Sequence, residues 1–276
     1  MGAKVSTPAP PPPTLMDDWH VMAAGFGCAL LLLQCALYAL FSSKLLPDGP
    51  WRAEPGFTAH QVIALPWVIY LTIEGGRAWF ESPPLPGFDD PLSRTTIVHP
   101  TGQLLSQLAA GAVLIWDTPT CFAVKSLRNT EMIIHHILMA GAAYQVAVLP
   151  FMTYYASFFF GFIELSGIPL CIVDLMHPKH KPWVAYAAAR PWLEGINNAS
   201  RGLFVLGYFA VRIGMFPYYA FTGVIADAVA LLRAETYPAV PLVTVIFFAA
   251  SLTAMQIYWG YLIVKQLQKM AAGKGA

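Results

Sequence analysis

Charged residues are scarce in this chain of 276 residues, because aspartate, glutamate, lysine and arginine together make up only 11% of it. A typical soluble domain carries about 25% charged residues. Hydrophobic residues make up 57%, and the mean hydropathy is +0.56. This composition excludes an ordinary soluble enzyme and a disordered protein, and it indicates a polytopic membrane protein.

An excess of one charge is also lacking, since 16 basic and 15 acidic residues leave a net charge of +1 without a basic block. The balance excludes nucleic acid as a partner. Cysteine is rare as well, and the four residues lie in apolar runs without CxxC spacing: Cys28, Cys35, Cys121 and Cys171. We therefore expect no disulfide framework and no metal site formed by cysteines.

Long apolar runs are what the chain does have, and each run of about 20 residues is long enough to cross a bilayer as a helix. Val21–Phe41 and Ala239–Val264 contain no charged residue. Five further candidate spans are interrupted by a few polar residues, at 61–80, 103–124, 130–149, 151–173 and 202–226. The sequence predicts an all-α membrane bundle of about seven helices, with 218–232 as a candidate for a short eighth.

Four regions follow from these runs. Residues 1–18 are proline-rich and predict an extended arm, which is a candidate contact for membrane-protein partners. Residues 19–54 hold the first span and a loop, 55–270 form the main membrane domain, and 271–276 are a C-terminal tail.

Lysine and arginine predict the orientation, because cytosolic loops are enriched in them. With seven spans, one side of the membrane receives three basic residues, Lys4, Arg94 and Arg233, and two more, Arg77 and Arg212, lie within the membrane. The opposite side, which also holds the C-terminus, receives eleven: Lys44, Arg52, Lys125, Arg128, Lys179, Lys181, Arg190, Arg201, Lys265, Lys269 and Lys274. We expect a cytosolic C-terminus and a lumenal or external N-terminus.

Ionisable residues inside predicted spans are the strongest functional signal, because they are expensive in a bilayer. We single out six of them: Asp117, Glu131, His135, His136, Glu164 and Arg212. Glu131 and His135 are four positions apart, so the two share a helix face, whereas His136 points about 100° away from His135. We expect His135 to face the interior near Glu131 or Glu164, and His136 to pack against a neighbouring helix.

Several roles remain open for these residues. The histidine pair is typical either of a general base or nucleophile or of two imidazoles that tie helices together. A di-iron site would add His177 and His180, but it needs more histidines than the seven present, so no metal is predicted. Arg212 either pairs with Glu164 or Asp117, or binds a phosphate.

Three aromatic residues lie at the end of the final span: Tyr258, Trp259 and Tyr261. Their position is typical of the aromatic belt at a membrane interface.

The order of these features resembles the TLC-domain family, which includes the ceramide synthases and their non-synthase relatives. The features are His135-His136, Glu164-x-Ser166-x-x-Pro169, Arg212 with Pro217, and Gln256-Ile257-Tyr258-Trp259 before a basic tail. The resemblance covers about residues 55 to 270. Gly167 takes the place of the second acid of the synthases, and with Pro169 it makes the chain more similar to the non-synthase relatives.

The resemblance implies six helices around a cavity that takes a lipid acyl chain, in the endoplasmic reticulum or another intracellular membrane. It implies His135, His136 and Glu164 as catalytic residues supported by Glu131 and Asp117, and acyl-CoA as a substrate that Arg212 would bind. No tightly bound cofactor is expected besides bound lipid. Two functions remain open: a lipid-binding protein with acyltransferase chemistry, and a non-catalytic subunit of a larger membrane complex.

Overall fold

The structure, a computed structural model, describes residues 18–81 and 88–273, and helices make up nearly all of them. All but the last residue of the predicted proline-rich arm at 1–18 lies outside the described residues, as do the last residues, 274–276. Within the described part there is no strand. Six helices are long and apolar enough to cross a membrane: Trp19–Ser42, Pro55–Phe80, Thr130–Val148, Thr153–Leu175, Pro191–Ala234 and Ala239–Ala271. The predicted all-α membrane bundle is confirmed.

The first half of the chain begins with α1 and α3, which are joined by a loop with one short helix. Its elements are α1 (Trp19–Ser42), α2 (Pro50–Ala53), α3 (Pro55–Gly76), η1 (Arg77–Glu81), α4 (Pro91–Thr96), α5 (Pro100–Gly111), η2 (Ala112–Asp117), α6 (Thr118–Ala123), η3 (Lys125–Leu127) and α7 (Thr130–Val148). The second half comprises α8 (Thr153–Phe159), η4 (Phe162–Ser166), α9 (Gly167–Leu175), α10 (Lys181–Ala188), α11 (Pro191–Gly207), η5 (Tyr208–Met215), α12 (Phe216–Tyr219), η6 (Ala220–Ile225), α13 (Ala226–Ala234) and α14 (Ala239–Ala271).

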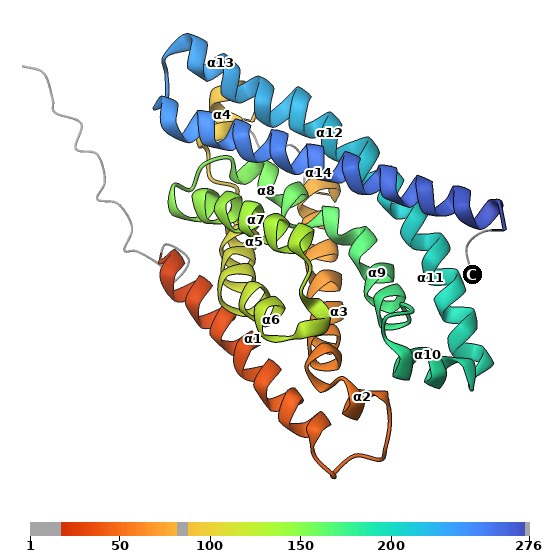
Figure 1. Ribbon diagram of the computed structural model, residues 1–276. Coiled ribbons are helices and arrows are strands. Elements are labelled where there is room, and N and C mark those ends of the chain that lie inside the picture. The colour runs from red at the N-terminus through yellow and green to blue at the C-terminus, as the bar shows by residue number, and fades with distance from the viewer. Residues whose placement is uncertain (1–17, 82–87, 274–276) are drawn as a thin grey trace, which may run out of the picture.

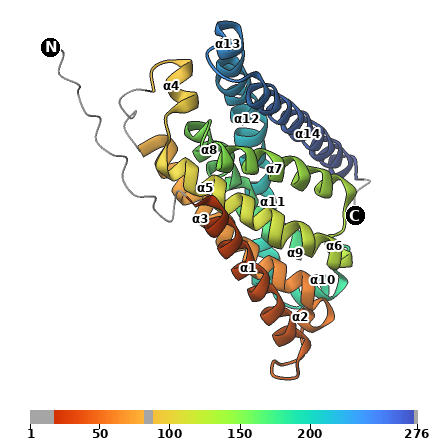
Figure 2. The ribbon, with the colours of Figure 1, turned by 90° about the vertical axis from the view of Figure 1, so that its left-hand side faces the viewer.

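The helices form an antiparallel bundle in which α1 packs on α3 and α5, α5 packs on α7, and α7 packs on α14. On the other side of the bundle, α9 packs against α3 and α11. Figures 1 and 2 show α2 and α10 at one end of the bundle and α4 and α13 at the other. This arrangement leaves α3, α7, α9, η5 and α14 around the centre.

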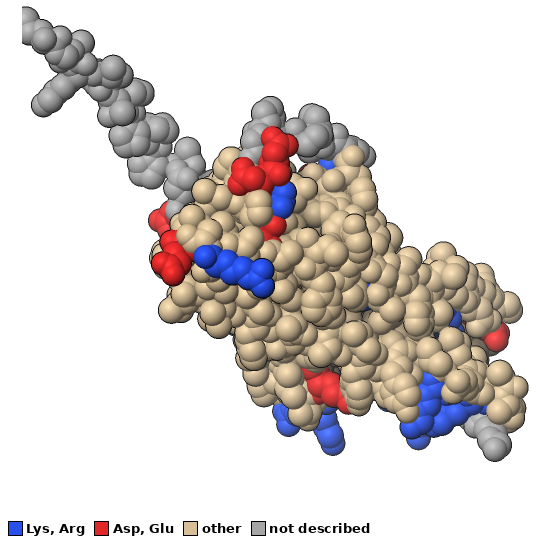
Figure 3. All heavy atoms as spheres, turned by 90° about the horizontal axis from the view of Figure 1, so that it is seen from above, with Lys and Arg blue, Asp and Glu red and all other residues tan. Residues whose placement is uncertain are grey.

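The surface matches a protein embedded in lipid. In the space-filling view of one face, charged side chains are sparse and gather near the margins, with a broad uncharged area between them (Figure 3). Many large apolar side chains are exposed on the outer helices, such as Leu32 at 71% and Leu206 at 70%. In water so much exposed apolar surface would favour association, whereas in a bilayer it contacts acyl chains.

The predicted span at 103–124 differs from the other predicted spans. It is helical, as α5, η2 and α6, but it is not among the six segments that are apolar enough to cross a membrane alone. Its polar side chains point into the bundle, and Ser106 and Gln107 are fully buried. Neighbouring helices shield these groups from lipid, so the segment needs less apolar surface than an isolated span.

The candidate eighth helix at 218–232 is not separate. It continues the helix that begins at Pro191, and the whole segment runs without interruption to Ala234. Pro217 lies between η5 and η6, which are both π-helical. A proline lacks the amide proton of a normal helical turn, and the wider π-helical turns on either side let the helix pass it without a break.

Close helix packing depends on glycine where α1 crosses the end of α5. A Cβ atom at Gly111 would lie 2.0 Å from the carbonyl oxygen of Ala23, and one at Gly27 would lie 2.4 Å from the carbonyl oxygen of Gly111. Only hydrogen fits at these positions. Small residues allow such backbone contact between membrane helices, so this crossing fixes the first span against the bundle.

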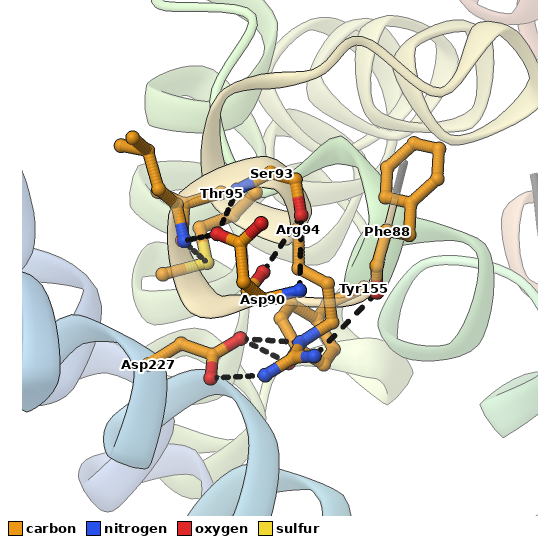
Figure 4. Close-up of polar contacts among 9 residues, drawn as sticks. Phe88, Asp90, Ser93, Arg94, Thr95, Tyr155 and Asp227 are labelled. Atoms are coloured by element: carbon orange, nitrogen blue, oxygen red, sulfur yellow. Dashed lines mark hydrogen bonds and ion pairs between the residues drawn. The ribbon is translucent and has the colours of Figure 1, made fainter. Parts of the chain in front are cut away.

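A polar network joins α4 to α13 at the end of the bundle opposite α2 and α10 (Figure 4). Arg94 donates through Nε to Oδ2 of Asp227 at 2.8 Å and through Nη2 to Oδ1 at 2.7 Å. The hydroxyl of Tyr155 on α8 donates to the same carboxylate at 2.6 Å and accepts from Arg94 at 3.2 Å. The network therefore holds three elements together, and it fixes the hydroxyl end of the Tyr155 ring.

Candidate functional site

A cavity of about 440 Å³ lies among the central helices. Most of its wall is apolar, with side chains such as Leu71, Met139 and Phe160. Ionisable side chains from α3, η2, α7, η4 and η5 reach it as well: His60, Asp117, His135, His136, Glu164 and Arg212. The fold thus brings five of the six ionisable residues predicted within the spans into one cavity, and it adds His60.

Asp117 is the centre of the polar part of the cavity. Nε2 of His60 lies 2.8 Å from Oδ1 of the carboxylate, and Nε2 of His136 lies 3.3 Å from Oδ2. The thiol of Cys121, one turn further along the helix, contacts Oδ1 at 3.7 Å. Two imidazoles from different helices therefore share one carboxylate, with Cys121 beside them.

The local backbone explains the position of Asp117. It is the last residue of η2, a π-helical segment within the α5–α6 helix. Such segments are frequent at functional sites because the extra residue turns neighbouring side chains to a different face. Arg212 lies on η5, which is π-helical as well. Two of the charged residues of the cavity are thus presented by irregular turns inside membrane helices.

His135 has a different environment from His136. Its ring packs edge-on against Trp259 of α14, with ring centroids 5.1 Å apart. Its Nδ1 is buried and has no hydrogen-bond partner within the described part of the chain. Among residues 18–81 and 88–273, no carboxylate is bonded to this imidazole, which lines the cavity beside His136.

The expected contact between His135 and Glu131 is not formed. Glu131 does not line the cavity, and its Oε1 accepts a hydrogen bond of 3.1 Å from the hydroxyl of Tyr258 at an exposed position. Glu131 lies in the first turn of α7, and its amide is capped by the side chain of Asn129. At the end of a helix the carboxylate reaches the polar surface, so it has no need to turn inward.

Glu164 pairs with Arg212 and not with a histidine. Its Oε2 accepts from Nη2 of Arg212 at 3.1 Å, and Nε of Arg212 donates to the hydroxyl of Ser166 at 2.8 Å. A Cβ atom at Gly167 would lie 2.8 Å from the same Oε2. The missing side chain at Gly167 therefore leaves the space in which Glu164 reaches Arg212. The predicted binding of a phosphate by Arg212 stays a prediction.

Sequence reasoning missed three residues of the site. His60 is not among the residues that the sequence singles out, and it lies within α3 on the face that also carries Ala64 and Trp67. This spacing of three and four residues was the available signal. Trp259 lines the cavity, whereas the interfacial belt was predicted for it; Tyr258 and Tyr261 are exposed. For Cys121 the spacing from Asp117 was the only clue.

Three side chains have a geometry that a metal ion could use. One ligand atom each from Asp117, Cys121 and His136 lies within 4.8 Å of the others. Histidines that bind metals almost always donate their second ring nitrogen to another group. Nδ1 of His136 has no such partner within the described residues. The hydrogen-bonded arrangement around Asp117 therefore accounts for these residues better than a metal centre does.

A match to a known protein family covers the residues of the site. A family model for the TLC domain matches residues 29–265, which is most of the chain and includes every residue of the cavity. No curated protein and no solved structure matches the chain.

Proposed function

This chain belongs to the TLC domain family, and on that premise we propose that it binds a lipid acyl chain in the central cavity and transfers the acyl group there. The observation that carries the proposal is the convergence of His60, Asp117, His135 and His136 on one apolar-walled cavity among membrane helices. Its volume, about 440 Å³, is within the range of small-molecule sites. Apolar walls with a polar group of residues match a molecule that has a hydrocarbon chain and a polar reacting end.

The proposed chemistry uses His135 as the base. An acceptor amine or hydroxyl attacks the thioester carbonyl of an acyl-CoA, and the imidazole of His135, which lines the cavity, removes the proton from the attacking group. The carbon–sulfur bond then breaks, and the CoA thiolate leaves and takes up the proton from His135. Asp117 holds the ring of His136 in place at 3.3 Å, and the ring of His136 lies beside that of His135, with centroids 5.9 Å apart. His136 is therefore a positioning residue for His135 in this scheme.

The orientation follows from the basic residues. Lys44 and Arg52 lie in the segment around α2, and Lys179 and Lys181 lie at the start of α10, so these four residues belong to the end of the bundle that carries α2 and α10 (Figures 1 and 2). By the predicted count of seven spans, the lysine-bearing end of α14 reaches the same side. We propose that this end faces the cytosol, in an intracellular membrane where acyl-CoA is supplied. Contacts of residues 1–17 with membrane-protein partners are a further part of the proposal.

The test is turnover of the purified full-length protein in mild detergent or liposomes, with acyl-CoA and membrane lipids as substrates and mass spectrometry of the products. We expect His135→Ala to abolish turnover with a small loss of stability, because His135 has no hydrogen bond to lose. His136→Ala should lower turnover and destabilise the fold by about 1–3 kcal/mol, because it leaves buried polar groups unpaired.

Glu131→Gln is the matched control, because Glu131 lies on the same helix but outside the cavity. It should leave turnover at the level of the unsubstituted protein. A protein that retains bound lipid but gives no product with any acyl-CoA would contradict the acyltransferase and support the non-catalytic alternative. A protein that retains no acyl lipid would overturn the proposal as a whole.

A further inference from the structure

A second pocket lies behind the central cavity. It holds about 60 Å³ among α7, α8, η6 and α14, several times the about 10–15 Å³ that one water molecule needs. Its wall is apolar throughout except for Tyr155, and the hydroxyl of Tyr155 is bonded to Asp227 and Arg94. Pockets without polar partners stay free of water and accept apolar groups.

Two side chains separate this pocket from the central cavity. Met139 and Phe160 line both spaces. Along α7 the lining residues pass from His135 to Met139 and then to Ala142 and Val146, at steps of three or four residues. One face of a single helix therefore leads from the unpaired imidazole, past Met139, into the apolar pocket.

We infer that the apolar pocket is the subsite for the methyl end of the acyl chain, and that Met139 and Phe160 set the length of chain that fits. This inference rests on the proposed binding of an acyl chain in the central cavity. Methionine is unbranched and flexible, so Met139 can move aside for a chain that passes it. Phe160 is buried at 5% exposure and packed against α3 and α5 residues, so it is the fixed side of the passage.

The chain-length profile of bound lipid tests the inference. The full-length protein and its variants are loaded with an equimolar series of saturated fatty acids of increasing length, washed, and analysed by mass spectrometry. Met139→Ala should shift the retained chains to longer members, by about fourfold in affinity for each additional methylene group buried. Ala142→Leu, which fills the apolar pocket, should shift the profile to shorter chains.

Met132→Ala is the matched control, since Met132 lies two turns before Met139 on α7 and lines only the central cavity. It makes the same change of side chain, and it should alter the total amount of fatty acid retained without moving the profile. A second measurement uses the unsubstituted protein and needs no variant to fold. A long-chain fatty acid with a diazirine at its methyl end is photolysed, and the labelled peptides are mapped.

We expect the label on the α14 segment that contains Val245, Phe248 and Ala249, which line the apolar pocket and not the central cavity. Labelling confined to residues of the central cavity, or equal profiles for Met139→Ala, Ala142→Leu and the unsubstituted protein, would overturn the inference while lipid binding stands. Absence of any retained fatty acid in the unsubstituted protein would instead refute the proposed function, and the inference with it.

Discussion

Arg94 and Asp227 are 133 residues apart in the sequence, and their side chains form a two-bond ion pair with N–O distances of 2.7 and 2.8 Å. The Asp227 side chain is almost fully buried, at 4% exposure, whereas Arg94 keeps 24%. The bond to Asp227 raises the pKa of Arg94 above its usual value, so the guanidinium stays charged over the whole accessible pH range. The contact fixes α4 to α13, at the far end of the long Pro191–Ala234 helix.

Breaking this pair should destabilise the protein strongly. Arg94→Ala leaves the buried carboxylate of Asp227 without its cationic partner and with only the hydroxyl of Tyr155 bonded to it, and we expect a loss of about 3 kcal/mol in the free energy of unfolding. Arg94→Lys should recover only part of it, because an ammonium group cannot form the two parallel bonds. Thermal unfolding in detergent measures both effects.

Arg77→Ala is the control for this prediction, because the pair of Arg77 with Glu74 is exposed and lies near the end of the Pro55–Phe80 helix, where a membrane helix reaches the polar interface. Exposed pairs contribute up to about 1 kcal/mol. If Arg94→Ala and Arg77→Ala lowered the melting temperature equally, the Arg94–Asp227 pair would have no special structural role.

His99 predicts a dependence of stability on pH. It is buried, and Nδ1 accepts a hydrogen bond of 3.2 Å from the amide of Gly102 at the start of α5. Burial lowers the pKa of His99 below its usual value of 6.5. The unfolded chain therefore binds a proton more readily than the folded protein does, and stability falls as the pH drops below about 6.5 towards the folded pKa.

His99→Asn separates this contribution from those of other histidines. Asparagine is a good residue at the start of a helix and does not titrate, so the variant should remain folded with a flatter melting temperature between about pH 5 and pH 7. An unchanged pH dependence in the variant would show that groups other than His99 are responsible.

Two glycine substitutions should have opposite effects. Gly111→Ala places a methyl group 2.0 Å from the backbone oxygen of Ala23, where neither helix can yield without moving, and should separate α1 from α5. Gly202→Ala meets nothing within 4 Å on α11, and should stabilise that helix by about 0.5–1 kcal/mol because alanine is the better helix former. Melting temperatures that shift in the same direction would contradict the packing described for α1.

The shared carboxylate of Asp117 predicts coupling between two histidines that do not bond to each other. His60→Ala and His136→Ala each remove one bond to Asp117, and the double variant leaves the carboxylate without either imidazole. We expect the loss in the double variant to differ from the sum of the single losses by about 0.5–3 kcal/mol. A double-mutant cycle on the free energy of unfolding measures this, and strict additivity would mean that the two bonds act independently.

The sequence by itself determined the class of fold and the approximate course of the chain. Scarce charge and long apolar runs leave the membrane as the only place where this chain can bury its surface, and inside a bilayer the backbone must satisfy its own hydrogen bonds as helices. These are local requirements, so Val21–Phe41 and Ala239–Val264 were visible without tertiary information. The division of the chain into helices was wrong at Pro217, where π-helical turns on either side carry one continuous helix past the proline.

The partners of the polar residues were decided only by the tertiary structure. The intramembrane ionisable residues were recognisable one by one, because each carries a desolvation cost that must be offset somewhere. Which residue offsets it depends on how helices distant in sequence rotate and cross. Sequence spacing predicted a contact between Glu131 and His135. In the folded protein Glu131 instead accepts a hydrogen bond from Tyr258, and Glu164 pairs with Arg212. Asp117 contacts both His60 and His136.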